Sequence, residues 1–201
     1  GAVLADADGQ NALQLTSADS DDSEPKVSGD GRYIVFTSRR SGFNQIWRMN
    51  IDGGNPILLT DVPGITQYPR FAADGKTVVF RWFSEGSAPL GQVSVEGGPV
   101  KGIDGLPRSI IYHWADSPDG KFVAFTSTDP ITARLTVVLK PTDPSGLIET
   151  LDIWPTRIFK WMPDGRSIFY QERQRGDNLS TKVFQIDPEH PEPKILLTTE
   201  A

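Results

Sequence analysis

Four side chains with chemical capability crowd one short segment of the sequence. Tyr112, His113, Trp114 and Asp116 offer aromatic surface, a titratable imidazole and a carboxylate. Such groups, gathered in one concave place, are typical of a ligand pocket. A carboxylate in an otherwise apolar strand needs partners if it is buried. The structural alternative is that the strand shifts locally, Trp114 fills the core and Asp116 accepts hydrogen bonds from turn amides.

Three more residues extend this candidate binding site. Tyr68 and Arg157 occupy places in the chain that correspond to this segment, and Trp154 lies in an Ile-Trp-Pro loop. A large apolar side chain on such a loop suits contact with a partner, although packing against the core is the alternative. The predicted binding residues are therefore Tyr68, Tyr112, His113, Trp114, Asp116, Trp154 and Arg157.

An acidic run suggests a second chemistry. Asp19, Asp21, Asp22 and Glu24 lie so close in the chain that their charges repel, which predicts a solvated loop or a bound cation. We favour the solvated loop and keep Asp19, Asp21 and Asp22 as weak cation candidates. The segment 6–11 has the look of a calcium loop but lacks the glutamate required at the twelfth position.

Catalytic machinery is not evident in this sequence. Cysteine is absent, which excludes thiolate nucleophiles, disulfides and cysteine-ligated zinc. His113 and His190 are the two histidines, too few for a multi-histidine metal site. No Gly-x-Ser-x-Gly elbow and no glycine-rich phosphate-binding motif occurs. We therefore predict that the chain is not an enzyme and needs no cofactor.

Charge and composition limit the partners. Lys and Arg number 20 and Asp and Glu 26, a formal net charge of −6 that argues against nucleic-acid binding. With 37% hydrophobic and 23% charged residues the composition is that of a globular protein, and no apolar run approaches the roughly 18 residues of a membrane span. The first residue is Gly1, so we expect a piece processed or cut from a longer protein.

A short turn motif recurs along the chain and organises these residues. A four-residue segment that ends in Asp-Gly, first seen as Ser28-Gly29-Asp30-Gly31, recurs with its Asp at positions 30, 74, 119 and 164, which are 44, 45 and 45 residues apart. Asp-Gly favours tight turns, because glycine accepts positive φ and aspartate bonds nearby backbone. Each pair is followed by an apolar run with an aromatic residue, such as Ile34-Val35-Phe36, which is typical of a strand buried on both faces.

Further strand-like segments precede and follow each of these runs. They complete a unit of four antiparallel strands, and a repeat of about 40–45 residues with four strands is typical of a β-propeller blade. The alternative is an all-β sandwich with accidental spacing. We predict an all-β, β-propeller fold, as a partial ring of about four full blades and a half blade. The expected bounds are 1–16 for the half blade and about 24–60, 67–103, 111–151 and 157–199 for the blades.

The repeat resembles a known family. Ser28-Gly29-Asp30-Gly31, Ile34 to Ser38, Ile46-Trp47, Asp52-Gly53-Gly54 and Leu59-Thr60 are similar to the WD40-like (PD40-type) repeat of TolB-like propellers. The same repeat occurs in propellers attached to prolyl-oligopeptidase-type peptidases and in bacterial sensor proteins. The resemblance implies a propeller fold, whereas propellers serve many unrelated functions. The second repeat departs from the pattern, with Ala72-Ala73 before its Asp-Gly and Gly91 in its third strand.

The N-terminal segment matches the third and fourth strands of a repeat, since Asp8 and Leu15 precede Asp52 and Leu59 by 44 residues. We therefore expect a piece of a larger propeller, with open blade edges that suit self-association with a second copy.

The expected role is a non-catalytic module for protein–protein interaction or ligand sensing, in a bacterial envelope or signalling protein. The loops 17–24, 61–67, 104–112 and 152–157 would form its binding surface at the channel mouth. A periplasmic or other extracytoplasmic location is expected, without excluding the cytoplasm. Expected partners are a protein or other domains of the parent chain, with no nucleic acid. The alternatives are the gating propeller of a prolyl-oligopeptidase-type serine peptidase, and small-molecule or glycan binding at the channel mouth.

Overall fold

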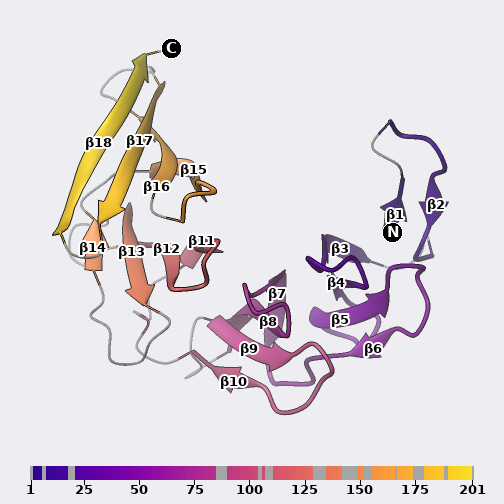
Figure 1. Ribbon diagram of the computed structural model, residues 1–201. Helices are drawn as coiled ribbons and strands as arrows, with labels where there is room; N and C mark the ends of the chain where they lie inside the picture. Colours follow the sequence, from indigo (N-terminus) through magenta and orange to yellow (C-terminus); the bar gives the residue numbers. More distant parts are fainter. Residues whose placement is uncertain are drawn as a thin grey trace. The chain divides into compact units, whose positions relative to one another are not determined.

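The fold consists of antiparallel sheets whose strands follow one another in chain order (Figure 1). The structure is a computed structural model that describes residues 2–5, 8–17, 21–84, 90–103, 106, 111–128, 135–141, 149–151, 155–165, 167–173, 179–187 and 190–200. Within these ranges there are one two-stranded sheet and four four-stranded sheets. The predicted all-β architecture of four-stranded units is confirmed.

The strands are short near the N-terminus and longer toward the C-terminus. The two-stranded sheet holds β1 (Val3–Leu4) and β2 (Leu13–Gln14). The first two four-stranded sheets hold β3 (Asp22–Val27), β4 (Tyr33–Ser38), β5 (Gln45–Asn50) and β6 (Ile57–Leu58), then β7 (Ile65–Phe71), β8 (Thr77–Phe83), β9 (Leu90–Ser94) and β10 (Lys101–Gly102). The last two hold β11 (Ile111–Asp116), β12 (Phe122–Thr128), β13 (Leu135–Pro141) and β14 (Glu149–Leu151), then β15 (Pro155–Trp161), β16 (Ser167–Arg173), β17 (Leu179–Asp187) and β18 (His190–Glu200).

The chain divides into two compact units, Gly1–Arg108 and Ser109–Ala201. In the first unit, β4 is buried on both faces. Ile34 packs with Ala2 in one apolar cluster, whereas its neighbour Val35 packs with Val78 and Phe80 of the next sheet in another. Alternate side chains of a strand point to opposite faces, so one strand supplies both clusters. Each fully buried side chain of this size contributes roughly 1.5–3 kcal/mol, which explains the unbroken apolar run.

The second unit is built in the same way. Its two four-stranded sheets, β11–β14 and β15–β18, share an apolar cluster. Trp161 packs against this cluster, and its ring stacks on that of Phe122 with centroids 6.4 Å apart. The indole Nε1 of Trp161 donates a hydrogen bond of 2.9 Å to the carbonyl of Ala115 in the neighbouring sheet. The fully buried members of this cluster are Ala124, Val137, Leu139 and Ile168.

The Asp-Gly motifs form the turns between first and second strands. In the first turn, Gly31 adopts a φ of 70°, and its amide donates to the carbonyl of Ser28 at 2.9 Å. The Ser28 hydroxyl donates to Oδ1 of Asp30 at 2.6 Å and accepts from the amide of Tyr33 at 2.9 Å. The third sheet repeats this arrangement with Ser117, Asp119 and Phe122.

The second and fourth turns obtain their hydroxyl from the opposite side. Ala72 and Met162 occupy the positions that correspond to the serine. In these two turns the hydroxyl belongs to the residue five positions after Ala72 or Met162. Thr77 donates to Asp74, and Ser167 donates to Asp164, both at 2.7 Å. Each of the four Asp-Gly turns between a first and a second strand therefore has a hydroxyl bonded to its aspartate, from one side or the other.

The first strands begin earlier than the sequence pattern indicated. The loops expected over 17–24, 61–67, 104–112 and 152–157 each end within a strand, since β3 begins at Asp22, β7 at Ile65, β11 at Ile111 and β15 at Pro155. The physical reason is an irregular pairing register inside each of these strands, which interrupts the side-chain alternation that identifies a strand from sequence.

No helix in the described part of the chain is long and apolar enough to cross a membrane.

Candidate functional site

The first strands of the four-stranded sheets share one irregularity. The register shifts between Ser23 and Lys26 in β3 and between Gln67 and Arg70 in β7. The corresponding shifts in β11 and β15 fall between Ile111 and Trp114 and between Pro155 and Phe159. Bulges of this kind redirect a side chain away from the regular face of a strand, and they are frequent beside binding sites.

In the first unit, two of these bulges contain a strained residue. Glu24 and Tyr68 both have a φ of 58°, a conformation that costs a residue other than glycine about 1–2 kcal/mol. The two residues are 44 positions apart, one repeat, so the strain recurs at the same place in consecutive sheets. Strain of this kind persists only where the surroundings enforce it, and it concentrates at functional sites.

Glu24 connects the two bulges. Its Oε2 accepts a hydrogen bond of 2.7 Å from the Thr37 hydroxyl within its own sheet. The same oxygen accepts a bond of 2.8 Å from the backbone amide of Tyr68 in the next sheet. A carboxylate therefore satisfies an amide that the bulge removes from the ladder, and it holds the two first strands together at this level.

The Tyr68 ring lies next to a guanidinium and a second aromatic ring. Tyr68 is 45% exposed and Phe83 is 42% exposed. Cζ of Arg81 lies 5.7 Å from the centroid of the Tyr68 ring and 4.3 Å from that of Phe83. A cation over an aromatic face is favourable by roughly 0.5–1 kcal/mol at an exposed site. Tyr68, Arg81 and Phe83, here termed the Tyr68 cluster, combine apolar area with positive charge.

The other predicted binding residues belong to the second compact unit. Tyr112, His113, Trp114 and Asp116 all lie on β11, and Arg157 lies on β15. Trp114 is 3% exposed and half-buried Asp116 is paired with Val123 across β11 and β12. The burial of Trp114 agrees with the structural alternative, in which this ring fills the core. Trp154 falls outside the described residues.

Arginines face the acidic run. Asp22, whose side chain is 1% exposed, forms an ion pair of 2.8 Å with Arg40, and Asp21 lies 3.7 Å from Arg39. The Arg40 guanidinium also covers the rings of Phe36 and Trp47, with its Cζ 5.1 and 5.0 Å from their centroids. These arginines provide positive charge at Asp21 and Asp22, whereas Asp19 lies outside the described residues. No group of three or more potential metal ligands occurs among the described residues.

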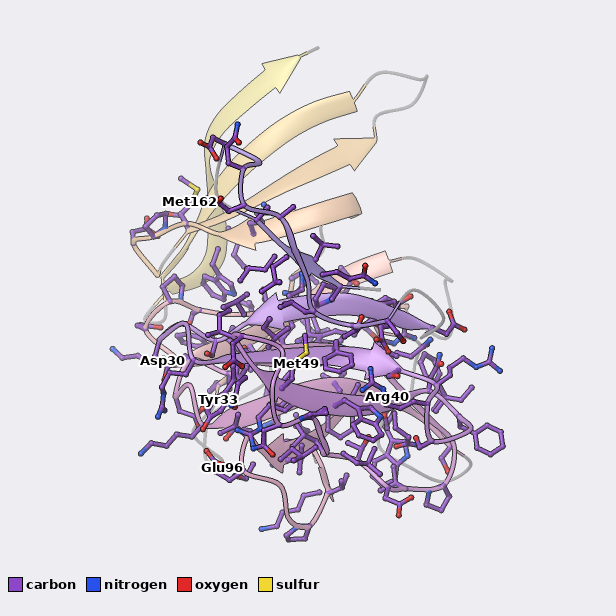
Figure 2. The ribbon with its side chains drawn as sticks, turned by 90° about the vertical axis from the view of Figure 1, so that its right-hand side faces the viewer. Asp30, Tyr33, Arg40, Met49, Glu96 and Met162 are labelled. Atoms are coloured by element: carbon purple, nitrogen blue, oxygen red, sulfur yellow. The ribbon has the colours of Figure 1, made fainter. Side chains whose placement is uncertain are left out.

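A second polar cluster lies near the start of β4, at the end of this strand away from Arg40. Figure 2 shows Tyr33 and Glu96 near Asp30, away from Arg40. The Tyr33 hydroxyl donates to Glu96 at 3.2 Å. The buried Arg48 places its Cζ 4.2 Å from the Tyr33 ring centroid and its Nη1 3.8 Å from Oε2 of Glu96. This cluster connects the first two four-stranded sheets and fits a structural role.

Sequence reasoning missed the bridging role of Glu24 and the presence of Arg81 and Phe83 beside Tyr68. Glu24 was counted with the acidic loop, although it lies in β3. A usable signal existed in the repeat: Glu24 and Tyr68 occupy equivalent positions, and each is followed by a proline, which has no amide to offer the strand pairing and is typical of bulges. Arg81 carries no such signal, because its contact with Tyr68 depends on the bulge.

The sequence matches a family model. The TolB beta propeller domain model (PD40) matches residues 3–140. No curated protein matches the chain.

Solved structures agree with this match at the level of the fold. TolB from Acinetobacter baumannii superposes with a TM-score of 0.73 and 20% identity, over 99% of this chain and 48% of that one. A putative TolB from Agrobacterium tumefaciens gives 0.67 and 16%, over 96% and 72% of the two chains. A puromycin-hydrolyzing peptidase from Mycobacterium tuberculosis gives 0.62 and 19%, over 90% and 32%. The chain thus spans about half of the Acinetobacter protein, and the predicted propeller fold is confirmed.

Proposed function

The chain belongs to the PD40 family of TolB β-propeller domains, and we propose that it is a non-catalytic module that binds a protein partner. The observation that carries this proposal is the Tyr68 cluster. It presents a half-exposed aromatic ring and a guanidinium from strands whose other faces are buried. Aromatic and arginine side chains dominate the binding energy of protein interfaces.

The geometry of the bulge supports a binding role. Tyr68 is held by its amide bond to Glu24 and by the Arg81 guanidinium against its ring. A ring fixed in this way loses little conformational entropy on binding, which favours affinity. The strained φ of Tyr68 is retained at a cost, and a core-packing role would not require the ring to be exposed.

The partner and location belong to the same proposal. An extended peptide segment of another protein, or of another domain of the parent chain, suits a surface made of strand edges and loops. A periplasmic or other extracytoplasmic location rests on the TolB resemblance. The absence of cysteine and of a nucleophile elbow from the sequence supports a non-catalytic role.

The test uses peptides selected from a displayed random library on the immobilised chain. We expect Tyr68→Ala to weaken the selected peptides about tenfold or more while the melting temperature stays within a few degrees. Val27→Ala is the matched control, because Val27 is also exposed and ends the neighbouring first strand. Equal affinity for the parent chain and Tyr68→Ala, at equal stability, would disprove the role of the Tyr68 cluster.

A second candidate is the gating propeller of a serine peptidase. Its support is the structural likeness to the puromycin-hydrolyzing peptidase. The two candidates differ in the parent protein: a hydrolase domain with an elbow serine beside this chain favours the peptidase, and a kinase or membrane-anchored segment favours the interaction module.

A further inference from the structure

One arginine of the first unit is buried without the hydrogen bonds that a buried charge requires. Arg48 lies on β5 with its side chain 5% exposed, and within the described part of the chain its Nε donor has no hydrogen-bond partner. Its Nη1 lies 3.8 Å from Oε2 of Glu96, which is too long for a hydrogen bond. A buried guanidinium paired this loosely is unfavourable until a better acceptor reaches it.

The fold itself does not require an arginine at this position. Arg48 lies opposite Val35, the residue before the aromatic of the second strand. In the other four-stranded sheets the same register position holds uncharged residues, which are Gln92, Leu139 and Val183. Leu139 is 1% exposed, so an apolar side chain fills this position within the same architecture. A structural connection between two sheets therefore explains the contacts of Arg48 but not its charge.

Two guanidinium groups and a hydroxyl converge at this place. Cζ of Arg48 lies 4.2 Å and Cζ of Arg32 lies 5.2 Å from the centroid of the Tyr33 ring. Arg32 is bonded to Asp30 through its Nε at 2.6 Å, and its side chain remains 69% exposed. The Tyr33 hydroxyl donates to Glu96. Guanidinium and hydroxyl donors are the groups with which proteins bind carboxylates and phosphates.

Glu96 stands where such an anion would bind. Its Oε1 accepts from the Tyr33 hydroxyl, and its Oε2 faces Arg48. The Glu96 side chain is 64% exposed, and nothing lies within 4 Å of the Cβ positions of Gly97 and Gly98, which follow it in the turn. An exposed carboxylate on an open turn is held weakly, so a ligand can displace it at little cost.

We propose that the donors of Arg48, Arg32 and Tyr33 form an oxyanion-binding site. When no ligand is bound, the Glu96 carboxylate occupies the place of the ligand. The ligand class is a phosphate or carboxylate group, which an arginine binds through two parallel hydrogen bonds. The site lies at the start of β4, whereas the Tyr68 cluster adjoins the end of that strand, so the site does not depend on the proposed function.

The test is a titration of the full chain with inorganic phosphate, and in parallel with acetate, at constant ionic strength. The amide chemical shifts of Gly97 and Gly98 in NMR spectra report binding at this place. Glu96→Gln keeps the shape of the side chain and removes the competing charge, so it should bind phosphate about tenfold more tightly than the parent chain.

Arg48→Leu introduces the residue that the third four-stranded sheet has at this position. We expect at least about a tenfold loss of phosphate affinity, while the melting temperature stays equal or rises. Arg39→Leu is the matched control, because Arg39 lies 3.7 Å from the carboxylate of Asp21 beyond the other end of β4. It should leave the affinity unchanged.

A second variant tests the hydroxyl. Tyr33→Phe keeps the ring beside Arg48 and removes one donor, so it should weaken phosphate binding about threefold. Tighter binding of acetate than of phosphate would identify a carboxylate ligand, and the reverse order a phosphate. The proposal is overturned if neither anion shifts the two glycine amides saturably, even in Glu96→Gln, or if Glu96→Gln weakens binding. It is also overturned if Arg48→Leu binds phosphate as well as Arg39→Leu does.

Discussion

The hydrogen bond from a hydroxyl to the turn aspartate best explains how the Asp-Gly turns between first and second strands are stabilised. The Ser28 hydroxyl, followed by Arg32, lowers the pKa of Asp30 to about 2, and the Ser117 hydroxyl likewise lowers the pKa of Asp119. A carboxyl with a lower pKa in the folded state stabilises the fold when ionised. That contribution is present above the unfolded pKa and is lost as pH falls through the folded value. The turns are therefore expected to weaken in acid.

The hydroxyl precedes the aspartate in the first turn, at Ser28, and follows it in the second, at Thr77, which leads to a prediction. Thr77→Val removes the hydroxyl that bonds Asp74 while preserving shape, and we expect a loss of about 0.5–1.5 kcal/mol. Adding Ala72→Ser places a hydroxyl where Ser28 has one, so the double variant should recover part of the loss. Urea unfolding of both single variants and the double variant measures the coupling. Strictly additive effects would show that the two positions do not serve the same carboxylate.

At the scale of the element, a glycine in a strand is explained by the ring across from it. Gly91 lies opposite Phe80 in the pairing of β8 with β9. A Cβ at Gly91 would lie 2.6 Å from Cε2 and 2.7 Å from Cζ of the fully buried Phe80. The absence of an aromatic residue from this third strand, which the sequence showed as a departure from the repeat, thus makes room for the ring of the second strand.

Gly91→Val should therefore destabilise the chain. Overpacking a buried site costs about 1–3 kcal/mol, and Phe80 is fully buried in the apolar cluster it shares with Val78 and Val93. Gly29→Ala is the matched control, since nothing lies within 4 Å of its Cβ position and the second repeat has Ala73 there. Thermal unfolding of both variants measures the effect. An unchanged melting temperature for Gly91→Val would contradict the steric explanation.

The same elements show which features the sequence could predict. Asp-Gly turns and apolar runs are local signals, so the four-stranded units followed from them directly. The bulges at Glu24 and Tyr68 broke the alternation, and the first strands were placed too short. The contacts of Glu24 with the Tyr68 amide and of Arg81 with its ring join segments 44 and 13 residues apart. Such pairs depend on how two strands bend, which no local pattern specifies.

At the scale of the whole molecule, the question is what couples one repeat to the next. In the first unit a buried network provides part of this coupling. The Thr60 hydroxyl donates to Gln45 at 2.7 Å, lies 2.8 Å from the hydroxyl of Thr66 and accepts from the Ile46 amide at 2.8 Å. Thr60 follows the last strand of one sheet and Thr66 lies in the first strand of the next. The Leu-Thr end of the repeat is therefore a connector between sheets.

Thr60→Val should uncouple these sheets as well as destabilise them. It removes the shared partner of the Ile46 amide, the Gln45 side-chain oxygen and the Thr66 hydroxyl. The Thr66 hydroxyl still lies 3.4 Å from the Gln45 oxygen, so the Ile46 amide is the group left without its acceptor, at a cost of about 1–3 kcal/mol. In repeat proteins, stability depends on interfaces between neighbours, so weakening one interface lowers cooperativity. We expect a lower urea midpoint together with a smaller m-value. Thr16→Val is the control, because the corresponding hydroxyl bonds the Ala2 amide at the edge of the unit. If both variants lower the midpoint equally and leave the m-value unchanged, the network stabilises each sheet separately and does not couple them.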